Sequence, residues 1–210
     1  MSRIGVFSGS FDPVHKGHIA FALEAAKTAD LDKVYLAPEV KPRRKPGITH
    51  FAHRVAMLKL AVRSQPKLEV LELPDKYFLP QKTLAQLRQR FPRDTLVMLL
   101  GSDLFEHLVE HSEQWPHVEA LLSSVELVVS ARTGQTNKAL QEMVGRLPVQ
   151  PLAFYIAHNH QPEVSSGMAR DRLKKGLNAS SLPASVAKYA AENWLYHDIE
   201  KAKIESPKDS

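Results

Sequence analysis

Short apolar runs alternate along the chain with longer segments whose apolar residues recur every three or four positions. The short runs are typical of buried strands, and they lie at residues 4–7, 33–37, 68–73, 95–100, 125–130 and 152–156. The longer segments predict helices at residues 17–29, 53–63, 83–91, 115–122, 168–175 and 184–195. Strands that alternate with helices indicate an α/β fold. We therefore predict a doubly wound, mostly parallel sheet with helices on both faces and a helical C-terminal extension.

No internal repeat, low-complexity tract or linker interrupts this pattern. A chain of 210 residues is long enough to bury a stable core without disulfides or metals. We expect a single domain over residues 1–200 and a disordered tail over the polar and charged residues 201–210.

Composition narrows the class of protein. Hydrophobic residues make up 43% of the chain and charged residues 24%, which excludes wholesale disorder. The absence of cysteine excludes disulfide scaffolds, iron–sulfur clusters and thiol catalysis. The N-terminus lacks the pattern of a signal peptide, and the longest apolar run, near residues 96–100, is far shorter than the ~20 residues of a membrane span. We expect a cytoplasmic protein that does not bind membranes.

The net charge of +5 is compatible with several kinds of acidic ligand. Aromatic residues do not interleave with the basic residues as they do in many RNA-binding modules. We therefore expect a phosphorylated metabolite as ligand rather than a nucleic acid.

The segment that carries most chemistry is residues 9–18, GSFDPVHKGH, between the first predicted strand and the first predicted helix. In Rossmann-like doubly wound sheets, nucleotide phosphates bind at this position. Gly9 permits a sharp turn, and Gly17 removes a side chain that would crowd a ligand. His15 and His18 can face the same side of the helix start, where unpaired N–H groups and the helix dipole favour an anion. The segment has neither the ending of a P-loop nor the GxGxxG pattern.

A second candidate anion site lies near the C-terminus. Ser165 and Ser166 come just before the helix predicted at residues 168–175, so their hydroxyls and the first N–H groups of the helix can bind an anion. Arg170, about one turn on, can bind two phosphate oxygens through its planar guanidinium. A metal site at the two histidines of the first segment has less support, because no acidic or Cys side chain lies at ligand spacing nearby.

These two segments resemble the HxGH and SSTxxR motifs of the nucleotidylyltransferase superfamily. Within it, the chain is similar to the nicotinate (or nicotinamide) mononucleotide adenylyltransferases, from Ile4 to about Tyr189. Further matching positions are Lys45, AHRVAML at residues 52–58, GSD at residues 101–103, Trp115 and LVVSAR at residues 127–132.

The resemblance implies an enzyme of NAD biosynthesis that transfers AMP from ATP to a pyridine mononucleotide and releases pyrophosphate. ATP would be the co-substrate, with Mg²⁺ carried by its phosphates and not by the protein. His15, His18 and Arg170 would be catalytic, with His18 at the α-phosphate and the other two on the triphosphate. The residues implied to bind ATP are Gly9, Ser10, Phe11, His15, Gly17, His18, Gly101, Asp103, Arg132, Ser165, Ser166 and Arg170.

The acceptor site is expected at a basic loop after the second predicted strand and at the tryptophan that in the family stacks on the pyridine ring. Its residues would be Lys41, Arg44, Lys45 and Trp115. Three positions depart from the family pattern: Arg43-Arg44-Lys45 replaces Pro-His-Lys, Leu79-Pro80 replaces a Tyr-Thr pair, and Gly167 replaces the Thr of SSTxxR. The Tyr-Thr pair belongs to the segment that recognises the pyridine carboxylate, so the preference for the acid or the amide stays open.

Two alternatives to a pyridine-nucleotide enzyme remain. One is a transferase that uses another phosphate acceptor, such as phosphopantetheine or a phosphorylated alcohol. The other is a catalytically reduced nucleotide-binding protein, because three motif positions have changed. Release of pyrophosphate separates these alternatives, since a sensor would bind ATP without turnover.

Overall fold

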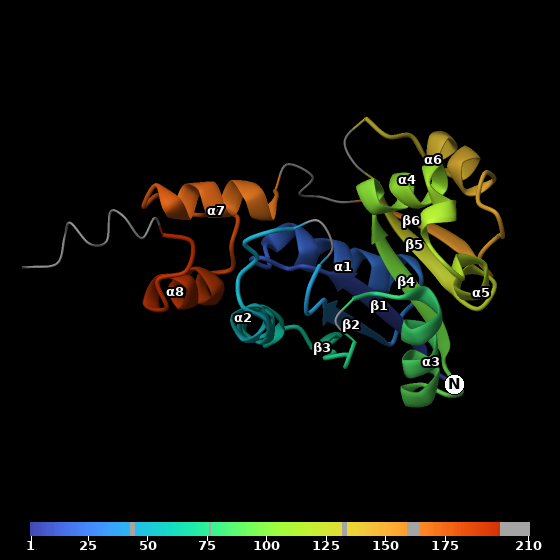
Figure 1. Ribbon diagram of the computed structural model, residues 1–210, viewed down its shortest axis with the longest axis horizontal. Coiled ribbons are helices and arrows are strands. Elements are labelled where there is room, and N and C mark those ends of the chain that lie inside the picture. Colours follow the sequence, from blue (N-terminus) through green and yellow to red (C-terminus); the bar gives the residue numbers. More distant parts are fainter. Residues whose placement is uncertain (43–44, 76, 132–133, 159–163, 198–210) are drawn as a thin grey trace, which may run out of the picture.

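The computed structural model describes residues 1–42, 45–75, 77–131, 134–158 and 164–197 (Figure 1). Its strands are β1 (Arg3–Gly9), β2 (Lys33–Pro38), β3 (Leu68–Val70), β4 (Thr95–Gly101), β5 (Glu126–Ala131) and β6 (Phe154–His158). Its α-helices are α1 (Lys16–Thr28), α2 (Phe51–Val62), α3 (Pro80–Arg90), α4 (Ser102–Glu110), α5 (Val118–Leu122), α6 (Asn137–Val144), α7 (Ser166–Lys174) and α8 (Ala184–Glu192). Arg44, Arg132 and the predicted tail at residues 201–210 lie outside the described residues.

The six strands form one sheet in the order β3-β2-β1-β4-β5-β6, and its five pairings are all parallel. The chain starts at β1 in the middle, winds outward to β3, and then returns to β4 on the other side of β1. The strand order therefore reverses between β1 and β4, and crevices for ligands form at the carboxyl ends of strands at such a point. The predicted Rossmann-like, doubly wound sheet is confirmed.

Helices cover both faces of the sheet because successive residues of a strand point to opposite sides. On β1, Phe7 packs into a buried cluster with residues of α1, α2, α7 and α8, whereas Val6 packs into a second cluster with residues of α3, α4, α5 and α6. Figure 1 shows α7 and α8 at one end of the molecule, near α1 and α2. The helices predicted near the C-terminus thus pack on the same face as α1.

The six strands and most of the helices lie within a few residues of their predicted bounds. Two helices, α4 and α6, were not predicted, and β3 ends three residues before its predicted end. The helix predicted over residues 115–122 begins only at Val118. Pro116 and the left-handed backbone of His117 (φ 62°) prevent an earlier start. Among the described residues, no helix is long and apolar enough to cross a membrane.

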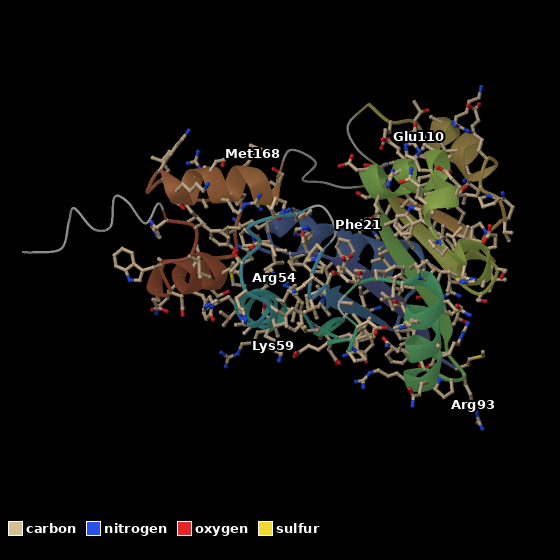
Figure 2. All side chains as sticks on the ribbon, viewed as in Figure 1. Phe21, Arg54, Lys59, Arg93, Glu110 and Met168 are labelled. Atoms are coloured by element: carbon tan, nitrogen blue, oxygen red, sulfur yellow. The ribbon has the colours of Figure 1, made fainter. Side chains whose placement is uncertain are left out.

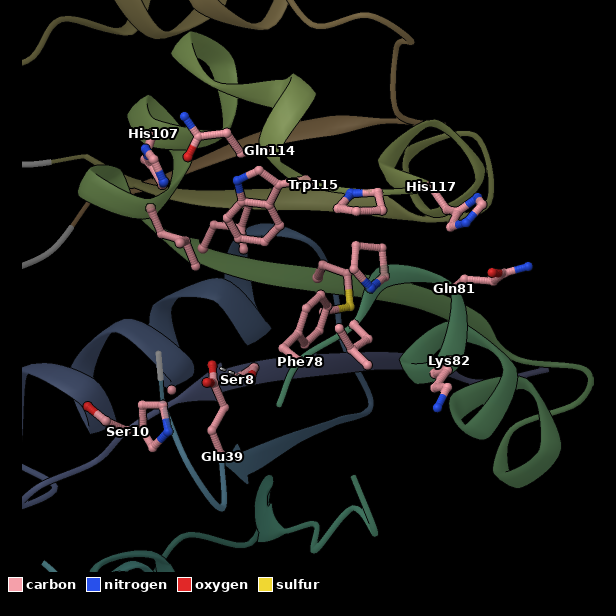
Figure 3. A pocket seen from close by; sticks show the side chains of 18 of the residues that line it. Ser8, Ser10, Glu39, Phe78, Gln81, Lys82, His107, Gln114, Trp115 and His117 are labelled. Carbon is pink, nitrogen blue, oxygen red and sulfur yellow. Dashed lines mark hydrogen bonds between the residues drawn. The ribbon is translucent and has the colours of Figure 1, made fainter. Parts of the chain in front are cut away.

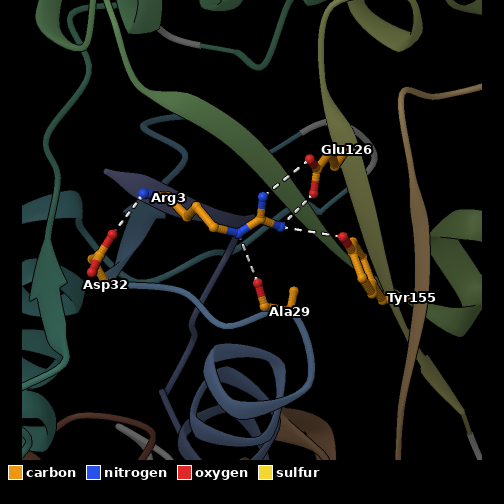
Figure 4. Close-up of polar contacts among 5 residues, drawn as sticks. All are labelled: Arg3, Ala29, Asp32, Glu126 and Tyr155. Carbon is orange, nitrogen blue, oxygen red and sulfur yellow. Dashed lines mark hydrogen bonds and ion pairs between the residues drawn. The ribbon is translucent and has the colours of Figure 1, made fainter. Parts of the chain in front are cut away.

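The amino ends of the strands are held together by Arg3 (Figure 4). Its guanidinium donates to both carboxylate oxygens of Glu126 on β5, at 3.2 and 2.6 Å, and to Tyr155 Oη on β6 at 3.3 Å. Arg3 Nε also donates to the carbonyl of Ala29 at the end of α1. This network joins β1 to β5 and β6 at the amino ends of the strands. The candidate site lies at the opposite, carboxyl ends.

Candidate active site

The loop that follows β1 turns at Phe11, not at Gly9 as the sequence suggests. Phe11 has φ 46°, in the left-handed region that side chains other than glycine rarely adopt. Gly9 has a different role: a Cβ atom on it would lie 3.2 Å from the Phe11 ring. The glycine therefore gives room for this buried ring beneath the loop.

His15 and His18 cap the start of α1 reciprocally. His15 Nδ1 accepts from the N–H of His18 at 3.3 Å, and His18 Nδ1 accepts from the N–H of His15 at 3.2 Å. The rings stack with centroids 3.6 Å apart. In a neutral imidazole one nitrogen accepts and the other carries the proton. Both neutral rings therefore carry it on Nε2, and each can donate one hydrogen bond from there.

Both histidines are held in the neutral form. Burial lowers the pKa of His15 to about 4. Burial lowers the pKa of His18 well below its usual value too, with smaller effects from His15 and the cation Lys45. The aromatic rings of Phe7 and Phe11 enclose His18, at centroid distances of 5.9 and 5.0 Å. At neutral pH the pair is a set of fixed N–H donors without net charge.

The depressed pKa of His15 predicts a loss of stability in mild acid. Between pH 6.5 and about pH 4 the unfolded chain binds a proton at His15 and the folded chain does not, so the free energy of unfolding falls as the pH falls. We expect His15 alone to contribute about 3 kcal/mol of this loss. Urea denaturation at a series of pH values measures it. His15→Asn keeps a capping acceptor but cannot titrate, and an equally steep pH dependence in this variant would contradict the prediction.

The first turn of α1 has fewer unpaired N–H groups than the sequence suggests. The N–H of Lys16 donates to the carbonyl of Ser181 at 2.9 Å, and the N–H of His18 donates to the His15 ring. Gly17, between them, is buried in the turn. The Nε2–H groups of His15 and His18 are therefore the main hydrogen-bond donors at this helix start, rather than its backbone N–H groups.

The second motif packs against the first. Ser165 is the N-cap of α7, and its hydroxyl accepts from the N–H of Met168. The hydroxyl of Ser166 donates to the carbonyl of Pro13 at 2.9 Å, and Arg170 Nη1 donates to the carbonyl of Asp12 at 2.6 Å. The two segments therefore contact each other directly, and one Arg170 donor is already used to hold the loop.

Arg54, on α2, holds together segments of the candidate site and was not predicted as a site residue. Its side chain is fully buried and lies in the interior beside α2 (Figure 2). It donates to four carbonyl oxygens at 2.7–2.9 Å, those of Ser10, Glu39, Val40 and Thr49. This one guanidinium joins the loop after β1 to the two segments that flank the basic loop. The sequence places Arg54 in the matching segment at residues 52–58 but does not show these contacts, because the three segments meet only in the folded chain.

A cavity of about 630 Å³ opens at the carboxyl ends of β1 and β4, where the strand order reverses (Figure 3). Trp115 and Phe78 lie in its middle, with Met98 and Leu100 of β4 also in its wall. Ser8, Ser10 and Glu39 lie on the side toward β1, and Gln81, Lys82 and His117 lie on the other side. The cavity can take an aromatic ring between polar groups at both ends.

Some of the predicted acceptor residues line this cavity, and others do not. Lys45 and Trp115 line it, and Lys45 Nζ donates to the hydroxyl of Ser10 at 2.8 Å. Lys41 is exposed and does not line it. The assignment of Lys41 to the acceptor stays a prediction.

Of the other predicted ATP residues, Gly101 is the N-cap of α4 and Asp103 is exposed in the first turn of that helix. Both residues therefore belong to the start of α4, which directly follows β4. Within the described ranges, no group of three His, Asp or Glu side chains is placed to hold a metal ion.

Comparisons with known proteins agree with this geometry. Residues 6–172 match the Cytidylyltransferase-like family. The nicotinate-nucleotide adenylyltransferase of Bacillus subtilis is 35% identical over 205 residues, which cover 93% of this chain and 99% of the relative. The solved Plasmodium falciparum nicotinic acid mononucleotide adenylyltransferase, complexed with NaAD, is similar in fold, with a TM-score of 0.74 at 18% identity over 93% of this chain and 98% of that one. Since the family match spans most of the chain and the bacterial relative matches over nearly its full length, the chain belongs to the nicotinate-nucleotide adenylyltransferases of the cytidylyltransferase-like family.

Proposed function

We propose that this protein transfers AMP from ATP to nicotinate mononucleotide, which yields deamido-NAD and pyrophosphate. The observation that carries the proposal is the stacked pair of His15 and His18, fixed as neutral Nε2 donors at the start of α1. Lys45 lines the cavity together with Trp115 and is close enough to His18 to lower its pKa, which supports a reaction between two nucleotides at this edge of the sheet. The relative from Bacillus subtilis bears the name of the same activity.

The residues supply positioning and charge stabilisation, and no covalent intermediate is needed. The phosphate of the acceptor attacks the α-phosphorus of ATP in line with the bond to the departing pyrophosphate. His18 Nε2–H would donate to an oxygen of the α-phosphate as negative charge builds up on it. His15 Nε2–H and the remaining donors of Arg170 would hold the other phosphates.

Mg²⁺ fits this site only as a companion of ATP. It supplies charge neutralisation of the triphosphate when bound. The described residues offer no cluster of three ligands, so we expect the phosphates to provide most of its coordination.

The acceptor ring is assigned to the cavity between Trp115 and Phe78. Lys45 lies at the Ser10 side, where it can attract the acceptor phosphate toward the histidine pair. This arrangement would bring the phosphate of one nucleotide to the α-phosphate of the other.

A panel of acceptors tests the proposal. The protein is incubated with ATP and Mg²⁺ and with nicotinate mononucleotide, nicotinamide mononucleotide or phosphopantetheine, and pyrophosphate is measured. We expect release with the pyridine nucleotides. Release with phosphopantetheine alone would favour the other transferase class. ATP binding without release with any acceptor would favour a sensor.

Replacement of Trp115 by Ala should raise the KM for the mononucleotide several-fold to tenfold and leave the KM for ATP nearly unchanged. The reason is that aromatic stacking contributes about 0.5–1.5 kcal/mol beyond buried area. Steady-state kinetics with each substrate varied in turn measures both constants. Leu152→Ala is the control, since Leu152 is 64% exposed and does not line the cavity. Equal effects of Trp115→Ala on both substrates would contradict the assignment of the ring.

Discrimination between the acid and the amide should be weaker than a site with a dedicated hydroxyl would give. Pro80 begins α3 and has no N–H, and the N–H of Leu79 already donates to the buried hydroxyl of Thr83. The ratio of kcat/KM for the two mononucleotides measures the preference. A ratio above about 10⁴, typical of a specific polar contact, would show that another group recognises the carboxylate.

A further inference from the structure

The chain segment after α8 reaches back to the loop that carries the two histidines. Tyr196 Oη donates to a carboxylate oxygen of Asp12 at 2.7 Å, across 184 positions in the sequence. The other oxygen of Asp12 accepts from the N–H of Thr49 at 3.3 Å. Asp12 is only 5% exposed, so these contacts replace the water that its carboxylate would otherwise bind.

The loop from Ser10 to Pro13 is fixed by donors from outside it. The carbonyls of Ser10, Asp12 and Pro13 accept from Arg54, Arg170 and Ser166 respectively. The carbonyl of Ser10 points toward Arg54, so the N–H of Phe11, on the other side of the same planar peptide unit, points away from it. The Asp12–Pro13 peptide is cis and Pro13 has no N–H, and Arg170 and Ser166 hold the carbonyls themselves there. Tyr196 adds a donor to the side chain of Asp12 from the segment after α8.

The backbone of this segment is held in an unfavourable conformation. Trp194 and Tyr196 both have left-handed φ angles, 50° and 69°, that residues with side chains rarely adopt. Such conformations persist where surrounding contacts enforce them, and they cluster near functional sites. Here the buried contact that accompanies the strained turn is the one between Tyr196 and Asp12.

A second contact ties the C-terminal half of the chain to the other end of the same loop. The N–H of Lys16 donates to the carbonyl of Ser181, and Lys16 Nζ donates to the carbonyl of Ser180 at 2.7 Å. The segments on either side of α8 thus contact the chain just before and just after His15. These two segments therefore hold the chain on both sides of His15, the N-cap residue of α1.

We propose that Tyr196 is a positioning residue for nucleotide transfer, which acts through Asp12 to fix the loop that leads to His15 and His18. This inference rests on the proposed function for its kinetic consequence. It makes the C-terminal segment part of the active-site scaffold. Burial and the neighbouring Asp12 raise the pKa of Tyr196, so the hydroxyl stays a donor over the working range of pH.

Tyr196→Phe removes only the hydroxyl, and Tyr189→Phe is its matched control. Tyr189 lies on α8, and its hydroxyl is 3.0 Å from His53 Nδ1, away from the loop. We expect Tyr196→Phe to lower kcat about tenfold with the KM for the acceptor unchanged within twofold, whereas Tyr189→Phe keeps kcat. A purely structural role predicts that both variants melt earlier and that both keep kcat. That result would overturn the proposal.

A readout without turnover separates this inference from the proposed function. Long-range ¹H–¹⁵N spectra of the imidazole rings should show shifted or broadened signals of His15 and His18 in Tyr196→Phe but not in Tyr189→Phe. Unchanged signals in both variants would refute the link even if the enzyme is active. A wild-type protein that releases no pyrophosphate would refute the function, while the spectra still decide the link. If Tyr196→Phe does not fold, Asp12→Ala removes the acceptor of the Tyr196 hydroxyl and should give the same changes.

Discussion

Replacement of His18 by Ala should lower kcat by about 10²–10³-fold while the protein stays folded. His18 offers a single Nε2–H whose direction is set by the contact of Nδ1 with the N–H of His15 and by the packed rings of His15, Phe7 and Phe11. A donor fixed in advance where charge develops typically accounts for a rate factor of this size. Single-turnover rates at saturating substrates measure the chemical step.

The control for this experiment is His111→Ala. His111 ends α4, its side chain is 45% exposed, and it does not line the cavity. We expect it to retain the wild-type rate. The cap that His18 provides is also lost in His18→Ala, so thermal melting is measured in parallel, with an expected cost of about 1 kcal/mol. Near-wild-type turnover in His18→Ala would contradict its role at the α-phosphate.

The largest effect on stability is expected for Arg54→Met, which should lower the free energy of unfolding by about 3 kcal/mol or more. The variant leaves four carbonyl oxygens of half-buried residues without their donor, and each such loss costs about 1–3 kcal/mol. It also removes one of the two guanidinium groups near Asp12 and leaves only that of Arg170. Urea denaturation measures the change.

Arg63→Met is the matched control for Arg54→Met. Arg63 caps the end of the same helix and is exposed, so its loss should change the free energy of unfolding by less than about 0.5 kcal/mol. Equal stability of Arg54→Met and Arg63→Met would show that Arg54 does not hold the loop after β1 in solution.

The strands could be predicted because helices cover both faces of the parallel sheet. Its strands therefore consist of continuous runs of apolar residues, such as residues 95–100. Helix α6 was missed because it is short, with only Leu140 and Val144 buried. Helix α4 was missed because the residues after β4 were interpreted as a ligand-binding loop, although Phe105, Leu108 and Val109 are buried at helical spacing.

The site divides in the same way. The meeting of His15 and His18 at a helix start could be predicted, because strand, turn and helix start are local features of the sequence. The contacts of Arg54 and Tyr196 with the loop could not, since their partners lie up to 184 positions away. Their roles depend on contacts that exist only after the sheet has formed.

The most direct test of the central claim follows the α-phosphorus of ATP. The protein is incubated with ATP labelled at the α-phosphorus, Mg²⁺ and nicotinate mononucleotide, and the products are separated. Attack at the α-phosphorus predicts that the label moves into deamido-NAD and that the pyrophosphate is unlabelled. Label that stays in ATP, or that appears in free AMP without any dinucleotide, would contradict the account.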